Sequence, residues 1–270
     1  MDKGPEIRVT RSAGPGKRAT PARVFQPVAA PAPWKVQFLP GPGEALVISF
    51  ASVGHDATRA PSPEFVGSAT AGGRPALFVA DESRSWTNAE GFAEMLAAAL
   101  AGVKARQPVR QVLLIGQSMG AFAALVAASL FPADAVIAIG PQFSVDPAVM
   151  PAETRWEEWT RRIAGFRIST APLPQGPRIT LMHGMADDMP QALAFPRQKG
   201  VDHLLFPGLA HSELAPQLKA RGCLPGLIEA ALAADRRRLL RIASSAGGVL
   251  RQRLADRHSA SEDMRHDRAG

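Results

Sequence analysis

The sequence has little of what secreted and membrane proteins need. It contains one cysteine, Cys223, so no disulfide can form within the chain, which suits a reducing compartment. Its longest apolar stretches, such as residues 121–131, are too short to span a bilayer and are typical of a core helix. The N-terminus has no apolar segment like that of a secretory signal. We therefore expect a cytoplasmic protein.

Signatures of metal and nucleic-acid binding are also missing from the sequence. No group of His, Cys, Asp and Glu has metal-ligand spacing, so we expect no metal and no cofactor. No nucleic-acid-binding module is recognisable, and charge alone gives only salt-sensitive, non-specific contact. The expected partner is a small molecule. The sequence does not indicate an oligomeric state.

Positive charge is concentrated at the two ends of the chain. The net charge is +7, yet residues 25–234 hold 16 Lys or Arg and 17 Asp or Glu, a net charge of −1. Residues 1–33 are basic and rich in Pro and Ala, which predicts disorder. Residues 224–270 predict a basic amphipathic helix and a tail, either a solvated face or a weak contact with an anionic surface. Residues 34–223 form the predicted domain.

The most informative segment is QVLLIGQSMGAFAALVAASLF, residues 111–131. A short apolar strand leads into Gly116-Gln-Ser118-Met-Gly120, and a run rich in Ala, Leu and Phe follows. A serine between two glycines at a strand-to-helix turn is the pattern of a nucleophile elbow. The glycines leave room for a strained turn that exposes the serine hydroxyl. The alternative is a glycine-rich turn in which Ser118 only caps the helix.

Two later segments supply an acid and a base in the order that such a fold requires. The apolar run Arg178–His183 ends at Gly184, and Asp187 and Asp188 follow shortly after it. Residues 201–206 predict a second strand, behind which His211 lies in a loop. The order Ser, Asp, His along the chain is that of a serine-dependent α/β enzyme.

These motifs resemble those of the α/β-hydrolase superfamily of serine hydrolases over about residues 35–222. The matching pieces are GQSMG at 116–120, HGxxD at 183–187 and PGLAH at 207–211. The resemblance implies that Ser118 is the nucleophile, Asp187 the acid and His211 the base. Asp188 adjoins Asp187, and the spacing from the HG pair favours Asp187.

The same resemblance implies acyl transfer chemistry through an acyl-enzyme. We expect hydrolysis of a carboxylic ester or thioester; transfer to an alcohol, and an inactive binding or accessory protein, are the alternatives. The oxyanion hole is expected at the backbone N–H of Met119 and that of Ala51 or Ser52, after the strand 45–50. The common HG motif is missing after that strand, which leaves the second donor open.

Several side chains are candidates for the substrate pocket, each with a structural alternative. His55 follows the strand 45–50, and Trp86 follows the strand 76–80 but is also expected to pack in the core. Residues 141–173 form a predicted cap insertion in which Trp156 and Trp159 either shape the pocket or anchor the cap. We predict structural roles for His183, as a packed residue, and for His203, as a half-exposed one.

Short apolar strands alternate with helical segments, which predicts an α/β fold with a mostly parallel central sheet, helices on both faces and a small cap. The expected strands are 35–39, 45–50, 76–80, 111–115, 135–139, 178–183 and 202–206. The expected helices are 88–102, 119–131, 189–199 and 212–221, with more helix beyond 224.

Overall fold

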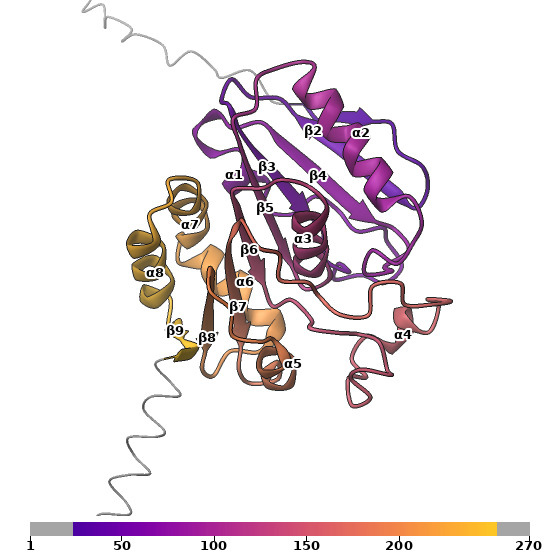
Figure 1. The fold of residues 1–270 in the computed structure, drawn as a ribbon, viewed down its shortest axis with the longest axis vertical. Coiled ribbons are helices and arrows are strands. Elements are labelled where there is room, and N and C mark those ends of the chain that lie inside the picture. Colours follow the sequence, from indigo (N-terminus) through magenta and orange to yellow (C-terminus); the bar gives the residue numbers. More distant parts are fainter. Residues whose placement is uncertain (1–23, 253–270) are drawn as a thin grey trace, which may run out of the picture.

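The computed structural model describes residues 24–252, which form a nine-stranded sheet. Its order is β1-β2-β4-β3-β5-β6-β7-β8-β9 (Figure 1). The six strands from β4 to β8 in this order are parallel, and β1, β2 and β9 pair antiparallel at the edges. The strands are β1 Gln26–Val28, β2 Trp34–Leu39, β3 Ala45–Phe50, β4 Ala76–Asp81, β5 Gln111–Gln117, β6 Ala135–Ile139, β7 Arg178–Gly184, β8 Val201–Phe206 and β9 Val249–Leu250.

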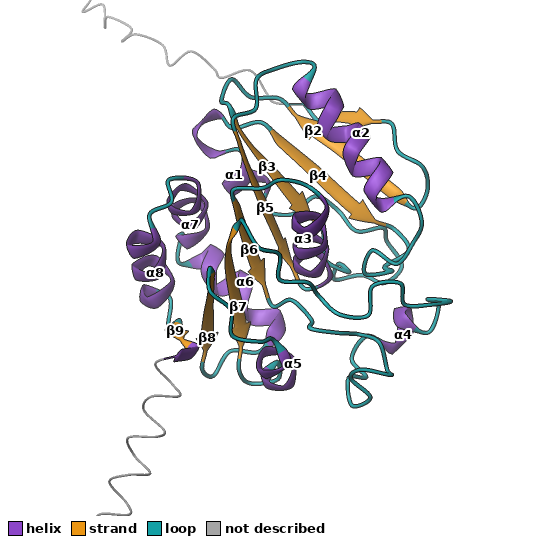
Figure 2. Cartoon of the chain, viewed as in Figure 1, coloured by secondary structure: helices purple, strands orange, loops and turns teal. Residues whose placement is uncertain are grey.

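Helices cover both faces of this sheet (Figure 2). One face packs against α2 and α3, and the other against α1, α6 and α7, with α8 lying on α7. The helices are α1 Val66–Ala69, η1 Ala71–Gly73, α2 Phe92–Lys104, α3 Met119–Leu130, α4 Glu157–Thr160, α5 Met189–Ala194, α6 His211–Ala220, α7 Cys223–Leu232 and α8 Arg236–Ser245. The predicted α/β class with a mostly parallel sheet is therefore confirmed.

Burial on both faces explains why the central strands have near-continuous apolar sequences. All five residues of β6 are buried, and so is the whole of β4. Helix α3 is buried over residues 119–128, so it is apolar all round rather than on one stripe. These elements place the elbow after β5 in the middle of the molecule, at the edge where the parallel strands end.

The ends of two helices differ from the expected ranges for local steric reasons. Helix α2 begins at Phe92 rather than 88, because Gly91 has a φ of 78° that interrupts the helix. Helix α5 ends at Ala194 rather than 199, because Pro196 disfavours helical geometry at the residue before it.

Two predicted boundaries also need correction. Residues 26–28, expected to belong to a disordered tail, form β1 and pair with β2. Residues from 224 onward, expected as an appended helix and tail, pack into the same core through Leu227, Ile228 and Leu239. Residues 1–23 and 253–270 lie outside the described part of the chain, and with them most of the predicted basic tails. No helix of residues 24–252 is long and apolar enough to cross a membrane.

Candidate active site

Ser118 occupies a strained turn between β5 and α3. Its φ of 54° and ψ of −124° lie in a region that side-chain-bearing residues rarely adopt. The turn is tight: a Cβ at Gly116 would lie 2.2 Å from the carbonyl of Gly120, and one at Gly120 would lie 2.1 Å from the oxygen of Phe50. Both glycines are therefore required by close backbone approach, as the motif predicts. Ser118 directly precedes Met119, the first residue of α3.

His211 is the first residue of α6, and its ring is held by Asp188. The His211 Nδ1 atom lies 2.7 Å from Asp188 Oδ2. The Asp188 backbone N–H donates to the Gly184 oxygen at 3.2 Å, which turns the Asp188 side chain inward after β7. Asp187 Oδ1 instead accepts the backbone N–H of His211 at 2.6 Å. The preference for Asp187 as the residue on the imidazole ring is therefore wrong, because the turn after Gly184 directs the next residue toward it.

The guanidinium of Arg155, a residue of the cap, binds the second oxygen of the Asp188 carboxylate. Arg155 Nη1 donates to Asp188 Oδ1 at 2.9 Å, and the guanidinium also pairs with Glu153. Burial opposes ionisation of Asp188, but the hydrogen bond and charge of His211 and the hydrogen bond from Arg155 hold its pKa below the usual value. Asp188 is thus a carboxylate that both the domain and the cap stabilise.

The hydroxyl of Ser118 is engaged by an amide rather than by the histidine. Gln142 Nε2 donates to Ser118 Oγ at 3.0 Å, and Trp86 Nε1 donates to Gln142 Oε1 at 2.9 Å. The His211 Nε2 atom is buried and has no hydrogen-bond partner among residues 24–252. The ring nitrogen opposite Asp188 is therefore available to accept a proton.

The two backbone N–H groups expected as oxyanion donors after β3 differ in whether they already make a hydrogen bond. The Ala51 N–H donates to the Val79 oxygen at 2.9 Å, so it is already used in the sheet. Within the described residues no hydrogen bond engages the Ser52 N–H or the Met119 N–H. Ser52 is fixed by its own hydroxyl, which donates to Glu64 Oε1 at 2.5 Å. Burial raises the pKa of Glu64 against the effect of that hydrogen bond.

Aromatic rings from the cap and from the loop after β4 cover the site. The Trp156 ring centroid lies 5.1 Å from that of His211 and 6.1 Å from that of Trp86, and Trp159 stacks on Trp156 at 6.4 Å. Ser118 is 3% exposed and His211 6% exposed, so this cover encloses the site. Trp86 is fully buried. His55 is exposed, and no described contact joins it to Ser118 or His211.

Behind the acid, two buried histidines form a hydrogen-bonded chain. His183 Nδ1 lies 2.9 Å from His203 Nε2, and His183 Nε2 lies 2.9 Å from the Pro141 oxygen. Burial lowers the pKa of His183 to about 4 and that of His203 to about 2, so both are neutral. His183 is packed, as predicted. His203, predicted to be half-exposed, is only 9% exposed because β9 and Arg251 cover the edge of β8.

Sequence reasoning missed three residues of this site, Gly140, Gln142 and Arg155. The first two follow β6, whose end lies beside that of β5, so the strand order contains the signal. A Cβ at Gly140 would lie 3.1 Å from His211 Nδ1, which is why a residue without a side chain is needed there. Arg155 belongs to an insertion with almost no regular structure, and no sequence pattern predicts which residue of such a segment reaches the site.

Comparison with known proteins bears on the fold and on the class of enzyme. Residues 80–199 match the model of the serine aminopeptidase S33 hydrolase family. The capsule O-acetyltransferase of Neisseria meningitidis serogroup A is 12% identical, with a TM-score of 0.52 over 76% of this chain and 95% of that one. No curated protein matches in sequence. At this identity the structural likeness shows the fold, and the family match supports a hydrolase.

Two further solved structures are similar at TM-scores below 0.5. A serine hydrolase without a lid from Xanthomonas campestris is 19% identical, with a TM-score of 0.48 over 76% of this chain and 93% of that one. A thioesterase-like protein from a Silicibacter species is 14% identical, with a TM-score of 0.49 over 68% of this chain and 76% of that one. Nothing follows from these two for the activity of this chain.

Proposed function

We propose that this chain is a serine hydrolase of the α/β-hydrolase superfamily that cleaves a carboxylic ester or thioester; the family match over residues 80–199 and the shared fold support this. The observation that carries the proposal is the state of His211. Its Nδ1 is bound to Asp188, and its Nε2 is buried without a partner among the described residues. His211 and the strained Ser118 both contact the end of β6: the Ser118 N–H donates to the Ile139 oxygen, and a Cβ at Gly140 would lie 3.1 Å from His211 Nδ1. An imidazole held in this way is a general base prepared to take one proton.

The reaction divides into two acyl transfers. His211 Nε2 removes the proton of Ser118 as Oγ attacks the acyl carbon, and Asp188 stabilises the imidazolium that forms. The leaving alcohol or thiol takes that proton from His211, and a covalent acyl-serine remains. Water then attacks the acyl-serine with His211 again as the base; the bond from the acyl carbon to Ser118 Oγ breaks, His211 returns the proton to Oγ, and the carboxylic acid is released. Both steps pass through a tetrahedral oxyanion, for which the open N–H groups of Met119 and Ser52 are the proposed donors.

The cap has two roles in this proposal. Gln142 holds Ser118 Oγ in the substrate-free state, and substrate entry replaces that hydrogen bond by the contact with His211. Trp86, Trp156 and Trp159 provide an apolar cover, which favours an uncharged acyl group and excludes bulk water. Movement of the tryptophan cover is therefore part of the catalytic cycle.

Acyl transfer to an alcohol uses the same residues and is the first alternative. It differs only in the acceptor that attacks the acyl-serine, so adding an alcohol to the assay separates the two activities. A second candidate, an inactive binding protein, is favoured by one observation: the serine hydroxyl is bonded to Gln142 and almost fully covered.

Labelling with a fluorophosphonate probe tests the proposal, since it requires an activated serine but no known substrate. We expect the parent protein to be labelled and Ser118→Ala and His211→Ala not to be. Asp188→Asn and Asp187→Asn form a matched pair: we expect labelling to slow by about 10³–10⁴-fold in the first and far less in the second. A folded parent protein that is not labelled refutes the hydrolase and supports the binding protein.

A further inference from the structure

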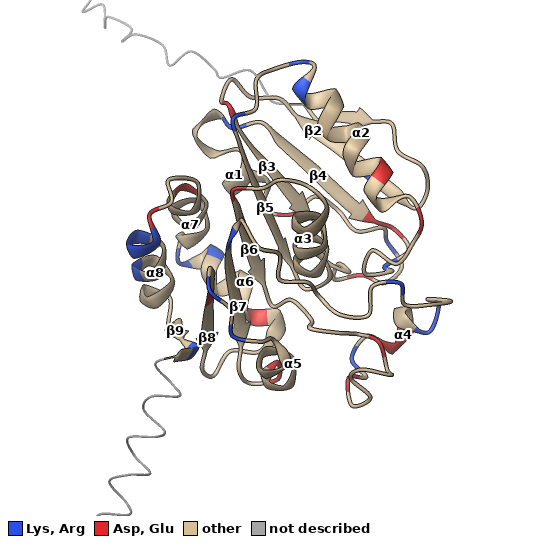
Figure 3. Ribbon diagram, in the orientation of Figure 1, with Lys and Arg blue, Asp and Glu red and all other residues tan. Residues whose placement is uncertain are grey.

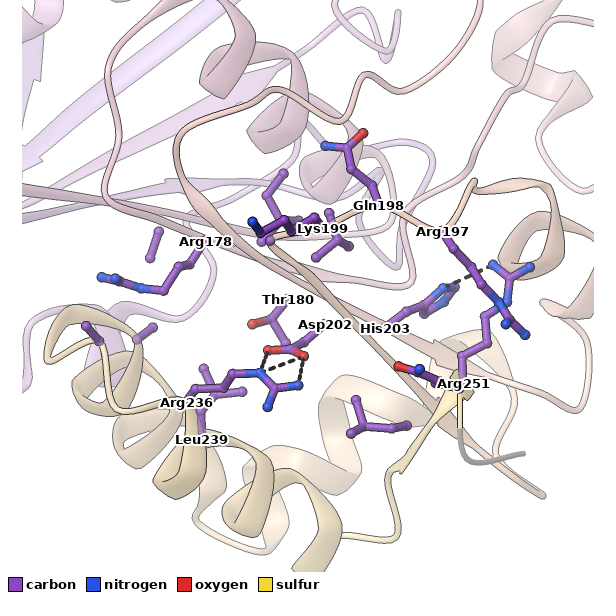
Figure 4. A pocket seen from close by; sticks show the side chains of 18 of the residues that line it. Arg178, Thr180, Arg197, Gln198, Lys199, Asp202, His203, Arg236, Leu239 and Arg251 are labelled. Atoms are coloured by element: carbon purple, nitrogen blue, oxygen red, sulfur yellow. Dashed lines mark hydrogen bonds and ion pairs between the residues drawn. The ribbon is translucent and has the colours of Figure 1, made fainter. Parts of the chain in front are cut away.

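A cavity of about 410 Å³ lies far from the serine, at the opposite ends of the parallel strands. Its lining includes the first residues of β7, from Arg178, and of β8, from Val201, whereas the candidate active site follows the last residues of these strands. The loop 196–200, helix α8 and the segment 250–252 close it from the other sides (Figure 4). Its volume lies within the range of small-molecule sites.

Five cationic side chains line this cavity, against one carboxylate, Asp202. They are Arg178, Arg197, Lys199, Arg236 and Arg251. Residues 24–252 as a whole hold 21 Lys or Arg and 18 Asp or Glu, so the five-to-one excess of cations in the cavity is not a property of the general surface. Figure 3 shows basic positions gathered at the start of α8. A concave surface with charge of one sign attracts ligands of the opposite sign.

The carboxylate in the cavity is already neutralised. Arg236 binds both oxygens of Asp202 through three hydrogen bonds of 2.6 to 3.0 Å. Arg251 is also fixed, because it donates to the backbone oxygens of Ala192, Leu193 and Phe195. Two of the five cations therefore have structural partners, and Asp202 balances only one charge.

Among residues 24–252 no carboxylate pairs with the other three cations, Arg178, Arg197 and Lys199. Burial lowers the pKa of Arg251, and the positive charge of Arg197 lowers it further. Like charges are thus placed together without a counter-charge. Such an arrangement is relieved by a bound anion.

We propose that this cavity binds a small phosphorylated molecule, with the phosphate held by Arg178 and Lys199. Arginine offers a fork of N–H donors that matches phosphate oxygens, and lysine adds a point charge. Apolar side chains supply the rest of the lining, among them Ile179, Leu239 and Leu250. These walls suit an uncharged organic part attached to the phosphate. The site is separate from the serine, and its existence does not depend on the proposed hydrolase.

Isothermal titration with phenyl phosphate tests this site on the full-length protein, with inorganic phosphate and benzoate as comparison ligands. We expect saturable binding of phenyl phosphate with a Kd of about 1 mM or tighter. Inorganic phosphate lacks the organic part and benzoate lacks the phosphate, so both should bind about tenfold more weakly or worse. Affinity should fall with added salt.

Two double variants with the same change of charge separate the cavity from the general surface. Arg178→Gln with Lys199→Gln should weaken phenyl phosphate binding about tenfold or more. Lys35→Gln with Lys104→Gln, on β2 and α2, should change it less than about twofold. Circular dichroism and thermal denaturation verify that each variant is folded. Absence of saturable binding, equal weakening in both double variants, or equal binding of benzoate overturns the proposal.

Discussion

The strained backbone at Ser118 predicts an unusual result for two inactivating substitutions. Ser118→Ala and Ser118→Gly both remove the hydroxyl and its hydrogen bond from Gln142. They differ in one respect, because alanine keeps a Cβ at a φ of 54° and ψ of −124°, whereas glycine adopts these angles without a steric penalty. The difference between the two variants therefore isolates the strain of the elbow.

The magnitude follows from two opposing contributions. A residue with a side chain in such a region costs about 1–3 kcal/mol, which glycine recovers. Glycine also gives the unfolded chain more freedom, which costs about 0.4–1 kcal/mol. We expect Ser118→Gly to be more stable than Ser118→Ala by about 0.5–2 kcal/mol. This corresponds to a rise of about 1–8 °C in Tm for a domain of this size.

Urea denaturation of both variants measures this difference, with equal m values as the check on two-state behaviour. Ala123→Gly, in the regular part of α3, is the matched control, and it should destabilise the protein by about 1 kcal/mol or more. If Ser118→Gly is less stable than Ser118→Ala by a similar amount, the elbow holds no strain and the reasoning is refuted.

Three further predictions concern buried charge. The pKa of His183 is lowered to about 4 and that of His203 to about 2. Both therefore take up protons mainly when the protein unfolds, and stability is lost as pH falls below about 6.5. Between pH 7.5 and 5.5 the two should cost about 3 kcal/mol, and His203→Gln should remove about half of this loss in urea denaturation at both pH values. Burial raises the pKa of Glu64, so its carboxylate opposes folding as pH rises, and Glu64→Gln should increase Tm more at pH 8 than at pH 4. Arg155→Met should raise the pKa of Asp188, lower kcat/KM for an ester about tenfold to a hundredfold and move the acid limb of the pH profile upward.

Each of these predictions has a result that would contradict it. If His203→Gln loses as much stability between pH 7.5 and 5.5 as the parent protein does, this histidine is not neutral in the folded state. A Tm gain for Glu64→Gln that is equal at both pH values would assign the effect to packing rather than charge. For Arg155, the control is Arg162→Met on the exposed part of the cap. Equal loss of activity in Arg155→Met and Arg162→Met would show that the contact of Arg155 with Asp188 has no specific effect on catalysis.

The sequence predicts the framework of this protein well because its signals are local. Apolar strands bounded by turns mark the sheet, and the glycines around Ser118 mark the elbow, since steric exclusion acts between near neighbours. The choice between Asp187 and Asp188 depends on one turn of backbone, which spacing does not encode. Gln142 and Arg155 reach the site from the cap, and only the three-dimensional arrangement brings them there.

The ion pair between Arg155 and Asp188 has a consequence for engineering this protein. Exchanging the cap would change substrate range alone only if the cap were independent of the catalytic residues. Here the cap also supplies the cation on Asp188 and the carboxylate of Glu153 that orients this cation. A transplanted cap without such a pair would remove a hydrogen bond that keeps Asp188 ionised, and would change the shape of the pocket at the same time. Selectivity and turnover therefore cannot be tuned separately in this fold unless Arg155 and Glu153 are retained.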